Sequence, residues 1–204
     1  MGSFRTLPRS FYRRPTVEVA RDLLGRYLVH ETSAGRLAVQ LVETEAYLGA
    51  SDRASHAFGG RRTARNASLY LPPGHAYVYF IYGKHFCLNA VTGLEGEGGA
   101  ILLRAAAVVE GEAFLRQNRC LMRPPRPAEL AGGPGKLCQA LGIDRSCDGV
   151  PLWRGTLRLA EGEPVAAKEI AAGPRIGIDY AGEAAAWPLR FAVAGHPEVS
   201  RPRP

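Results

Sequence analysis

Two runs of apolar and aromatic residues, joined by a glycine–lysine pair, restrict the centre of this chain to a β-hairpin. The runs read AYVYFIY (76–82) and HFCLN (85–89). Tyrosine, phenylalanine, isoleucine and valine favour strands, and Gly83 with Lys84 favours a tight turn between them. Because side chains alternate along a strand, Tyr77 and Tyr79 share one face, and Tyr82 lies at the turn. Strands joined by so short a turn pair antiparallel.

The length of this turn decides which side chains face each other. A two-residue turn pairs Tyr79 with Leu88 and puts Asn89 on the far face, whereas a three-residue turn over 83–85 sets Tyr79 opposite Asn89. Only the second register builds a polar and aromatic pocket from both residues. Simple strand packing also explains any single tyrosine, but it explains Tyr82 least well, because a large ring at a hairpin tip has little core to enter.

The remaining pattern predicts an α+β fold. Strands are expected at 26–32, 36–48, 100–109, 152–159, 174–180 and 188–194, and helices at 15–24, 110–119 and 135–141. The polar, arginine-rich stretch 49–68 is long for a connection without regular structure, which indicates a functional loop. We expect residues 1–204 to form a single compact domain, with 1–4 and 199–204 as flexible tails, around a curved, largely antiparallel sheet with flanking helices and a β-hairpin wedge.

Charge and composition narrow the possible partners. Lys and Arg outnumber Asp and Glu by 26 to 19, a net charge of +7, which favours an acidic partner such as nucleic acid over a merely solvated surface. The four cysteines form no CxxC motif and the five histidines have no neighbouring ligand partner, so we expect reduced thiols and no metal site. No run reaches the ~18 apolar residues of a membrane helix, so a cytoplasmic protein is expected, nucleoid-associated if bacterial.

Two carboxylates in the strand 36–48 are candidates for chemistry. Alternation puts Glu43, Glu45 and Tyr47 on the face of Val39 and Leu41, so that this face passes from core to pocket. A carboxylate at an apolar wall can act as a general base on water. The alternative is that both glutamates lie on a solvated edge.

The glycine-rich segment GGPGKLCQALG (132–142) precedes a predicted helix. It lacks the glycine and the hydroxyl residue of a Walker phosphate-binding loop. Lys136 at this helix N-terminus is suited to a DNA phosphate, and the segment is equally compatible with a simple turn.

Six segments together resemble the alkyladenine (3-methyladenine) DNA glycosylases of the mammalian methylpurine type. They are LVETEAYLG (41–49), ASHAFGGRRTARN (54–66), YVYFIYGKHFCLN (77–89), ILLRA (101–105), GPGKLCQALGI (133–143) and PRIGIDYAGE (174–183). Their order and spacing cover nearly the whole chain. The resemblance implies a monomer without metal or cofactor that acts on double-stranded DNA. Such an enzyme flips a damaged purine out of the duplex, hydrolyses its N-glycosidic bond and leaves an abasic site.

The resemblance also implies roles for individual residues. Glu45 corresponds to the general base, and Arg104 and the backbone carbonyl of Ile176 to groups that hold the attacking water. The residues that correspond to the base pocket are Tyr47, His56, Tyr79 and Asn89, of which Asn89 excludes the exocyclic amine of guanine. Tyr82 corresponds to the wedge that fills the gap in the duplex. The residues that the resemblance places along the DNA backbone or groove are Arg61, Thr63, Lys84 and Gly177, and Lys136 joins them as the candidate phosphate contact at the helix N-terminus.

These residues predict a monofunctional glycosylase for 3-methyladenine, with 7-methylguanine, hypoxanthine and ethenoadenine as further candidate substrates. A noncatalytic protein that binds damaged DNA or RNA is the main alternative, and a hydrolase of free nucleosides is a third.

Overall fold

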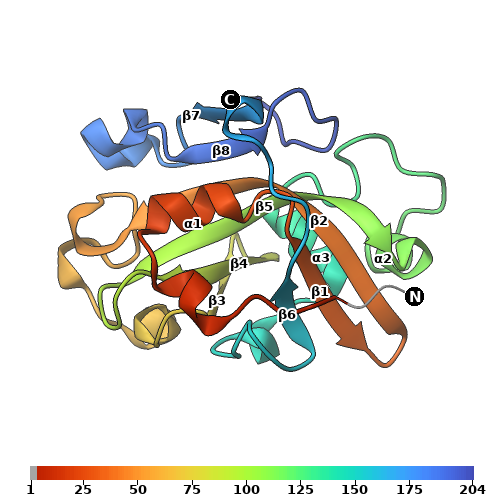
Figure 1. The fold of residues 1–204 in the computed structure, drawn as a ribbon, viewed down its shortest axis with the longest axis horizontal. Helices are drawn as coiled ribbons and strands as arrows, with labels where there is room; N and C mark the ends of the chain where they lie inside the picture. Colours follow the sequence, from red (N-terminus) through yellow and green to blue (C-terminus); the bar gives the residue numbers. More distant parts are fainter. Residues whose placement is uncertain (1–3) are drawn as a thin grey trace.

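One curved antiparallel sheet organises the structure, a computed structural model that describes residues 4–204 (Figure 1). Its main path runs β3-β4-β5-β2-β1-β6, and β8 pairs with β2 and β7. The strands are β1 (Tyr27–Thr32), β2 (Gly35–Leu48), β3 (Ala76–Ile81), β4 (His85–Thr92), β5 (Gly99–Glu110), β6 (Leu157–Ala160), β7 (Ile170–Gly173) and β8 (Arg190–Val193). The predicted α+β class and the antiparallel sheet are confirmed.

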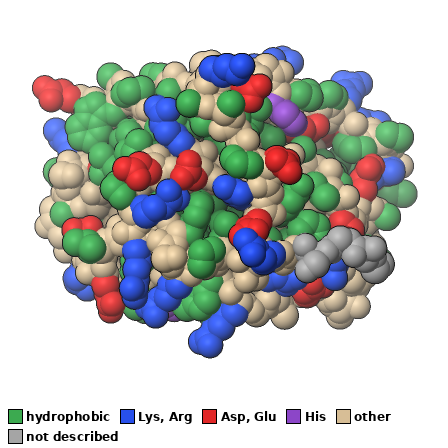
Figure 2. Space-filling model, in the orientation of Figure 1, with side chains coloured by type: hydrophobic (Ala, Val, Ile, Leu, Met, Phe, Trp, Pro, Cys, Tyr) green, Lys and Arg blue, Asp and Glu red, His purple; other side chains and the backbone are tan. Residues whose placement is uncertain are grey.

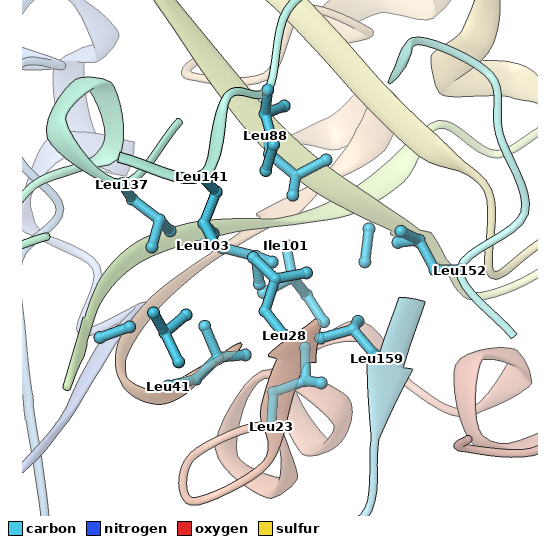
Figure 3. Packing of buried hydrophobic residues seen from close by; sticks show 14 of the residues in the cluster. Leu23, Leu28, Leu41, Leu88, Ile101, Leu103, Leu137, Leu141, Leu152 and Leu159 are labelled. Atoms are coloured by element: carbon cyan, nitrogen blue, oxygen red, sulfur yellow. The ribbon is translucent and has the colours of Figure 1, made fainter. Parts of the chain in front are cut away.

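The helices pack against the curved sheet (Figure 1). They are α1 (Thr16–Asp22), α2 (Glu112–Asn118) and α3 (Pro134–Leu141), of which α2 lies at the outer edge of the sheet. Figure 3 shows Leu23, from the end of α1, and Leu137 of α3 in the same leucine-rich cluster as Leu28, Leu41 and Leu103 of the sheet. Fully burying a leucine side chain contributes about 1.5–3 kcal/mol, so this cluster holds the helices against the sheet.

Short 3₁₀ helices fill the connections. They are η1 (Arg9–Arg13), η2 (Gly49–Ser51), η3 (Phe58–Gly60), η4 (Ala64–Tyr70), η5 (Arg145–Cys147), η6 (Ala167–Glu169) and η7 (Asp179–Ala186). The arginine-rich stretch 49–68 therefore has local structure. Asn66 secures it, because its side-chain amide donates to the carbonyls of His56 (2.8 Å) and Arg61 (2.9 Å).

An irregularity in β2 redirects its side chains. The pairing with β5 shifts register between Leu41 and Glu43 and again between Glu43 and Thr44. Before the shift Leu41 faces the main core, and after it Ala46 does. The expectation that Leu41, Glu43, Glu45 and Tyr47 share one face is therefore wrong. After the β-bulge the even-numbered residues of β2 face the core instead of the odd-numbered ones, so the carboxylates of Glu43 and Glu45 point away from the core.

Two other sequence expectations need correction. Residues 174–180 are not a strand, because Gly177 adopts the left-handed region (φ 75°) and the chain turns into η7. Of the strand expected at 152–159, only the part from Leu157 onward forms, as β6.

The C-terminal segment is packed rather than a free tail. Val199 and Ser200 are buried, and Arg190 donates to the carbonyls of Ser200 (3.1 Å) and Pro202 (2.6 Å). The sequence RPRP carries no apolar signal for this packing, since backbone carbonyls make it. At the other end, residues 1–3 lie outside the described part of the chain, and Phe4 packs edge-on against Tyr27. Within residues 4–204 no helix is long and apolar enough to cross a membrane.

Candidate active site

A cavity of about 350 Å³ brings most of the predicted site residues together. This volume lies within the range of roughly 300–1,000 Å³ usual for small-molecule sites. Its walls come from β2, the loop before η3, the β3–β4 hairpin, β5, the start of α3 and the segment before η7. The predicted residues that line it are Tyr47, His56, Tyr79, Tyr82, Asn89, Arg104, Ile176 and Gly177.

Glu45 is fully buried directly behind this lining. Its Oε1 accepts a hydrogen bond from the backbone N–H of Ile176 (2.8 Å) and lies 3.2 Å from Nη1 of Arg104. Its Oε2 accepts from the hydroxyl of Tyr47 (2.9 Å). Three groups that border the cavity thus hold the carboxylate in one orientation. The alternative of a solvated edge is excluded for both Glu45 and Glu43, since neither is exposed.

Glu43 forms a second buried centre next to Glu45. Its Oε1 accepts from Nε of Arg104 (2.8 Å), Nε of Arg190 (2.7 Å) and the hydroxyl of Ser200 (2.8 Å). Its Oε2 accepts from the N–H of Ser200 (2.7 Å). Burial alone would raise the pKa of Glu43, but Arg104, the Ser200 N–H and Arg190 outweigh it and lower that pKa. The pKa of Arg104 is raised despite its burial, because the charges of Glu45 and Glu43 favour the guanidinium.

Aromatic rings form a further part of the cavity wall. His56 meets Tyr79 edge-to-face (centroids 4.7 Å apart), and its Nδ1 lies 2.7 Å from the hydroxyl of Tyr77. Burial of the imidazole, together with the nearby charges of Arg65 and Arg61, lowers the pKa of His56. Its ring is therefore neutral at pH 7 and can offer one nitrogen to a ligand.

The hairpin has a register that differs from both predicted ones. Ile81 pairs with His85, so the turn comprises Tyr82, Gly83 and Lys84. Tyr79 consequently faces Cys87, and Asn89 faces Tyr77 and donates to its carbonyl (3.1 Å). The three-residue loop begins one residue earlier than expected because Tyr82 takes a left-handed conformation (φ 53°). Tyr79 and Asn89 still share one face and both line the cavity.

The tip of the hairpin stands at the mouth of the cavity. Tyr82 is 78% exposed although it is one of the largest apolar side chains in the protein, and Lys84 beside it is also exposed. A bulky residue with positive φ is strained, and such strain clusters at functional positions.

The residues predicted along the DNA take varied positions. Arg61 is exposed and lines a second cavity beside the first, together with Arg53 and Arg65. Thr63 caps η4, Gly177 is exposed at the rim, and Lys136 is half-buried and donates to the carbonyl of Ala128 (2.9 Å). On the face that carries α1, by contrast, basic and acidic side chains are interspersed (Figure 2).

Several residues that hold the site were not found from the sequence. Strand alternation predicts Glu43 only as a companion of Glu45, and its partners Arg190 and Ser200 lie about 150 residues away in the chain. Asp52 and Arg175 form a fully buried ion pair behind Tyr47. A charged residue inside an apolar stretch, as Arg190 is in LRFAV, is the signal that could have pointed to such a partner.

Among residues 4–204 no group of three or more His, Cys, Asp or Glu side chains is arranged to hold a metal ion. The four cysteines are free, and Cys87 lies in the cavity wall.

The comparison with known families decides the class of this site. The family model for Methylpurine-DNA glycosylase (MPG) matches residues 10–197. The chain belongs to this family. It is therefore a DNA glycosylase, and the alternatives of a noncatalytic binding protein and a free-nucleoside hydrolase are not supported.

Relatives of this glycosylase cover it almost end to end. A protein of Methanocella arvoryzae is 50% identical over 199 residues, which span 97% of each chain. One of Desulfitobacterium hafniense is 43% identical over 96% of this chain and 98% of its own. One of Streptomyces avermitilis is 44% identical over 95% and 90%. Each bears the name "Putative 3-methyladenine DNA glycosylase". Damaged DNA is thus the substrate class of the glycosylase described here.

Proposed function

We propose that this glycosylase excises alkylated purines, such as 3-methyladenine, from duplex DNA by activating water with Glu45. The observation that carries the proposal is the position of Glu45, which is buried behind a purine-sized aromatic cavity and fixed by Tyr47, Arg104 and the N–H of Ile176. 7-Methylguanine, hypoxanthine and ethenoadenine are further candidate substrates. The enzyme would work as a monomer, in the compartment that holds the chromosome.

Base recognition in this proposal depends on the aromatic walls. 3-Methyladenine in DNA is a cation, and the faces of Tyr47 and Tyr79 attract cations by about 0.5–2 kcal/mol each, more when water is excluded. His56 supplies a hydrogen-bonding edge beside them. Asn89, buried and held by the carbonyl of Tyr77, is suited to exclude the exocyclic amine of guanine, because an unpaired amine there would be costly.

The chemical step in this proposal is a hydrolysis. The oxygen of water bonds to C1′ of the deoxyribose while the bond from C1′ to the purine nitrogen breaks, and its electron pair leaves with the base. Glu45 accepts the proton of the water, and Arg104 and the carbonyl of Ile176 help to hold that water. The sugar becomes oxocarbenium-like in the transition state, which a nearby carboxylate also stabilises. General-base catalysis of this kind contributes typically about 10²–10⁴-fold.

Access to the base requires that the nucleotide leave the duplex. Flipping costs a few kcal/mol of stacking and pairing, and less at a damaged base. The exposed ring of Tyr82 stands at the cavity mouth, where it would fill the gap in the stack. Arg61, Lys84 and the rim at Gly177 would follow the backbone, with Thr63 and Lys136 shaping the segments beside it.

The test is an excision panel with matched variants. Duplexes of one sequence carry 3-methyladenine, 7-methylguanine, hypoxanthine or ethenoadenine, and chromatography measures free base in single turnover. We expect wild type to release 3-methyladenine, Glu45→Gln to lose at least about 100-fold in rate while it still binds the duplex, and the exposed Glu18→Gln to match wild type. Equal rates for wild type and Glu45→Gln would overturn the mechanism. Release of none of these bases would overturn the substrate class.

A further inference from the structure

A buried ion pair lies against the ring of Tyr47 on the side away from the cavity. The guanidinium carbon of Arg175 is 4.7 Å from the centroid of this ring. Tyr47 lines the cavity, whereas Arg175 does not and its side chain is completely buried. The ring of Tyr47 thus separates a fixed positive charge from the space where a base would bind.

Arg175 is held rigidly in this position. Its Nη1 and Nη2 donate to the two carboxylate oxygens of Asp52 (2.5 and 2.9 Å). The same two nitrogens donate to the backbone carbonyls of Ala46 (2.9 Å) and Ala184 (3.2 Å). Asp52 is fixed in turn by the N–H groups of Leu48 and Ala54. The direct contacts of Glu45 come from other groups, the Tyr47 hydroxyl, Arg104 and the Ile176 N–H.

A cation on one face of an aromatic ring weakens the attraction of the other face for a second cation. The ring attracts cations through its electron-rich faces, and two positive charges on opposite sides also repel each other with little solvent to screen them. A neutral purine bound at Tyr47 escapes this repulsion. A nearby positive charge also favours the electron pair that a neutral purine takes with it when it leaves.

We propose that Arg175 and Asp52 set the preference of this enzyme between cationic and neutral damaged purines. Arg175 lowers the advantage of cationic bases at Tyr47, and Asp52 restores part of it by partly neutralising Arg175. This inference rests on the proposed function, because it takes Tyr47 as a wall of the base site. Neither residue touches the base in this proposal, so both are specificity-determining through Tyr47.

The experiment compares two substrates in one sequence context, 3-methyladenine as the cation and hypoxanthine as the neutral base. The ratio of their single-turnover excision rates is the readout, since a general loss of structure or of Glu45 function lowers both rates together. Arg175→Gln removes the charge and keeps hydrogen-bonding capacity toward Asp52 and Ala46. Asp52→Asn removes the counter-charge. Arg175→Lys, which keeps the charge, is the matched control.

The two charge-changing variants are expected to move the ratio in opposite directions. Arg175→Gln should raise the rate for 3-methyladenine relative to hypoxanthine by about threefold or more, and Asp52→Asn should lower this ratio by a similar factor, as expected for a change within the usual range of cation–π energies. Arg175→Lys should stay within about twofold of wild type in this ratio, by the same criterion.

Thermal melts identify variants that fail to fold, and either charge-changing variant alone is sufficient to decide the sign. An unchanged ratio, or a shift in the same direction for both variants, would overturn the inference while leaving the proposed function intact. A wild type that releases neither base would instead overturn the proposed function.

Discussion

The guanidinium of Arg104 lies between two buried carboxylates, with its Nε 2.8 Å from Glu43 and its Nη1 3.2 Å from Glu45. Glu43 is also bound by Arg190, so two carboxylates and two guanidinium groups balance in charge. Glu43 anchors Arg104 from the side opposite the cavity, which leaves one edge of the guanidinium for Glu45. The geometry of the proposed base therefore depends on a residue that does not line the cavity.

Loss of the Glu43 charge is expected to destabilise the fold. Glu43→Gln leaves Arg104 and Arg190 buried without their shared counter-ion, and breaking a buried pair in this way costs about 3–5 kcal/mol. Urea unfolding should show this loss in the free energy of unfolding, while the exposed Glu18→Gln stays within about 0.5 kcal/mol of wild type. A loss for Glu43→Gln as small as that of the control would contradict the structural role of the pair.

The same carboxylate predicts a pH dependence of stability. The pKa of Glu43 is lower in the folded protein than its ordinary value of 4.5. Between these two pKa values the unfolded chain therefore binds more protons than the folded protein does. The contribution of Glu43 is therefore complete above pH 4.5 and is lost as the pH falls through the folded-state pKa. Melting temperatures measured from pH 7 downward should show the gap between wild type and Glu43→Gln narrowing only below pH 4.5. A gap that is constant across this range would refute the assignment.

Ser200 is expected to affect excision from outside the cavity. Its hydroxyl donates to Glu43 and lies 3.3 Å from Nη2 of Arg104. Ser200→Ala removes both contacts, and hydrogen bonds of this kind contribute about 0.5–1.5 kcal/mol. Because these contacts position Arg104, the single-turnover excision rate should fall by roughly 2- to 10-fold. Duplex affinity should not change.

Two further variants separate positioning from general packing. Ser200→Thr keeps the hydroxyl and should restore most of the rate, and Ser33→Ala, in the exposed β1–β2 turn, should match wild type. If Ser200→Thr and Ser200→Ala lose the same rate, the hydroxyl has no positioning role.

Local patterns in the sequence predicted most of the helices and strands, and they predicted part of the candidate active site. The pair Glu45 and Tyr47 follows from strand alternation over two residues, and the structure joins them by a hydrogen bond. The same rule failed over the longer span from Leu41 to Tyr47, because the bulge near Glu43 reverses the parity. A bulge depends on the partner strands, here β5 and β8, and the sequence of β2 alone does not contain them.

Long-range partners account for most of what sequence reasoning missed. Glu43 with Arg190, and Asp52 with Arg175, are separated by more than 120 residues, and no periodicity links them. The prediction of Arg104 as a site residue came from resemblance to a family rather than from spacing, whereas a three-residue turn already predicted Tyr79 and Asn89 in one pocket. The predicted turn was one residue out because propensity assigns a left-handed conformation to glycine rather than to a tyrosine such as Tyr82.

The strained, exposed Tyr82 offers a prediction in which stability and function separate. Tyr82→Gly relieves the left-handed backbone strain, worth about 1–2 kcal/mol, and loses about 0.5–1 kcal/mol through the greater freedom of glycine when unfolded. The free energy of unfolding should therefore rise by no more than about 1.5 kcal/mol. The ring would nevertheless no longer fill the stack, so base release from duplex DNA should fall by about 10-fold or more, in line with stacking energies of 1–3 kcal/mol per base.

The control for this prediction must distinguish a wedge from an exposed apolar contact. Phe114 in α2 is also exposed (40%), and Phe114→Ser should leave excision unchanged. Binding of undamaged duplex, which depends mainly on phosphate contacts, should fall less for Tyr82→Gly than excision does, and a 2-aminopurine next to the lesion should report reduced flipping. If Tyr82→Gly excises at the wild-type rate, the hairpin tip is not the wedge. If its excision and its binding to undamaged duplex fall by equal factors, Tyr82 is a general DNA contact, and its left-handed backbone serves only to close a three-residue turn.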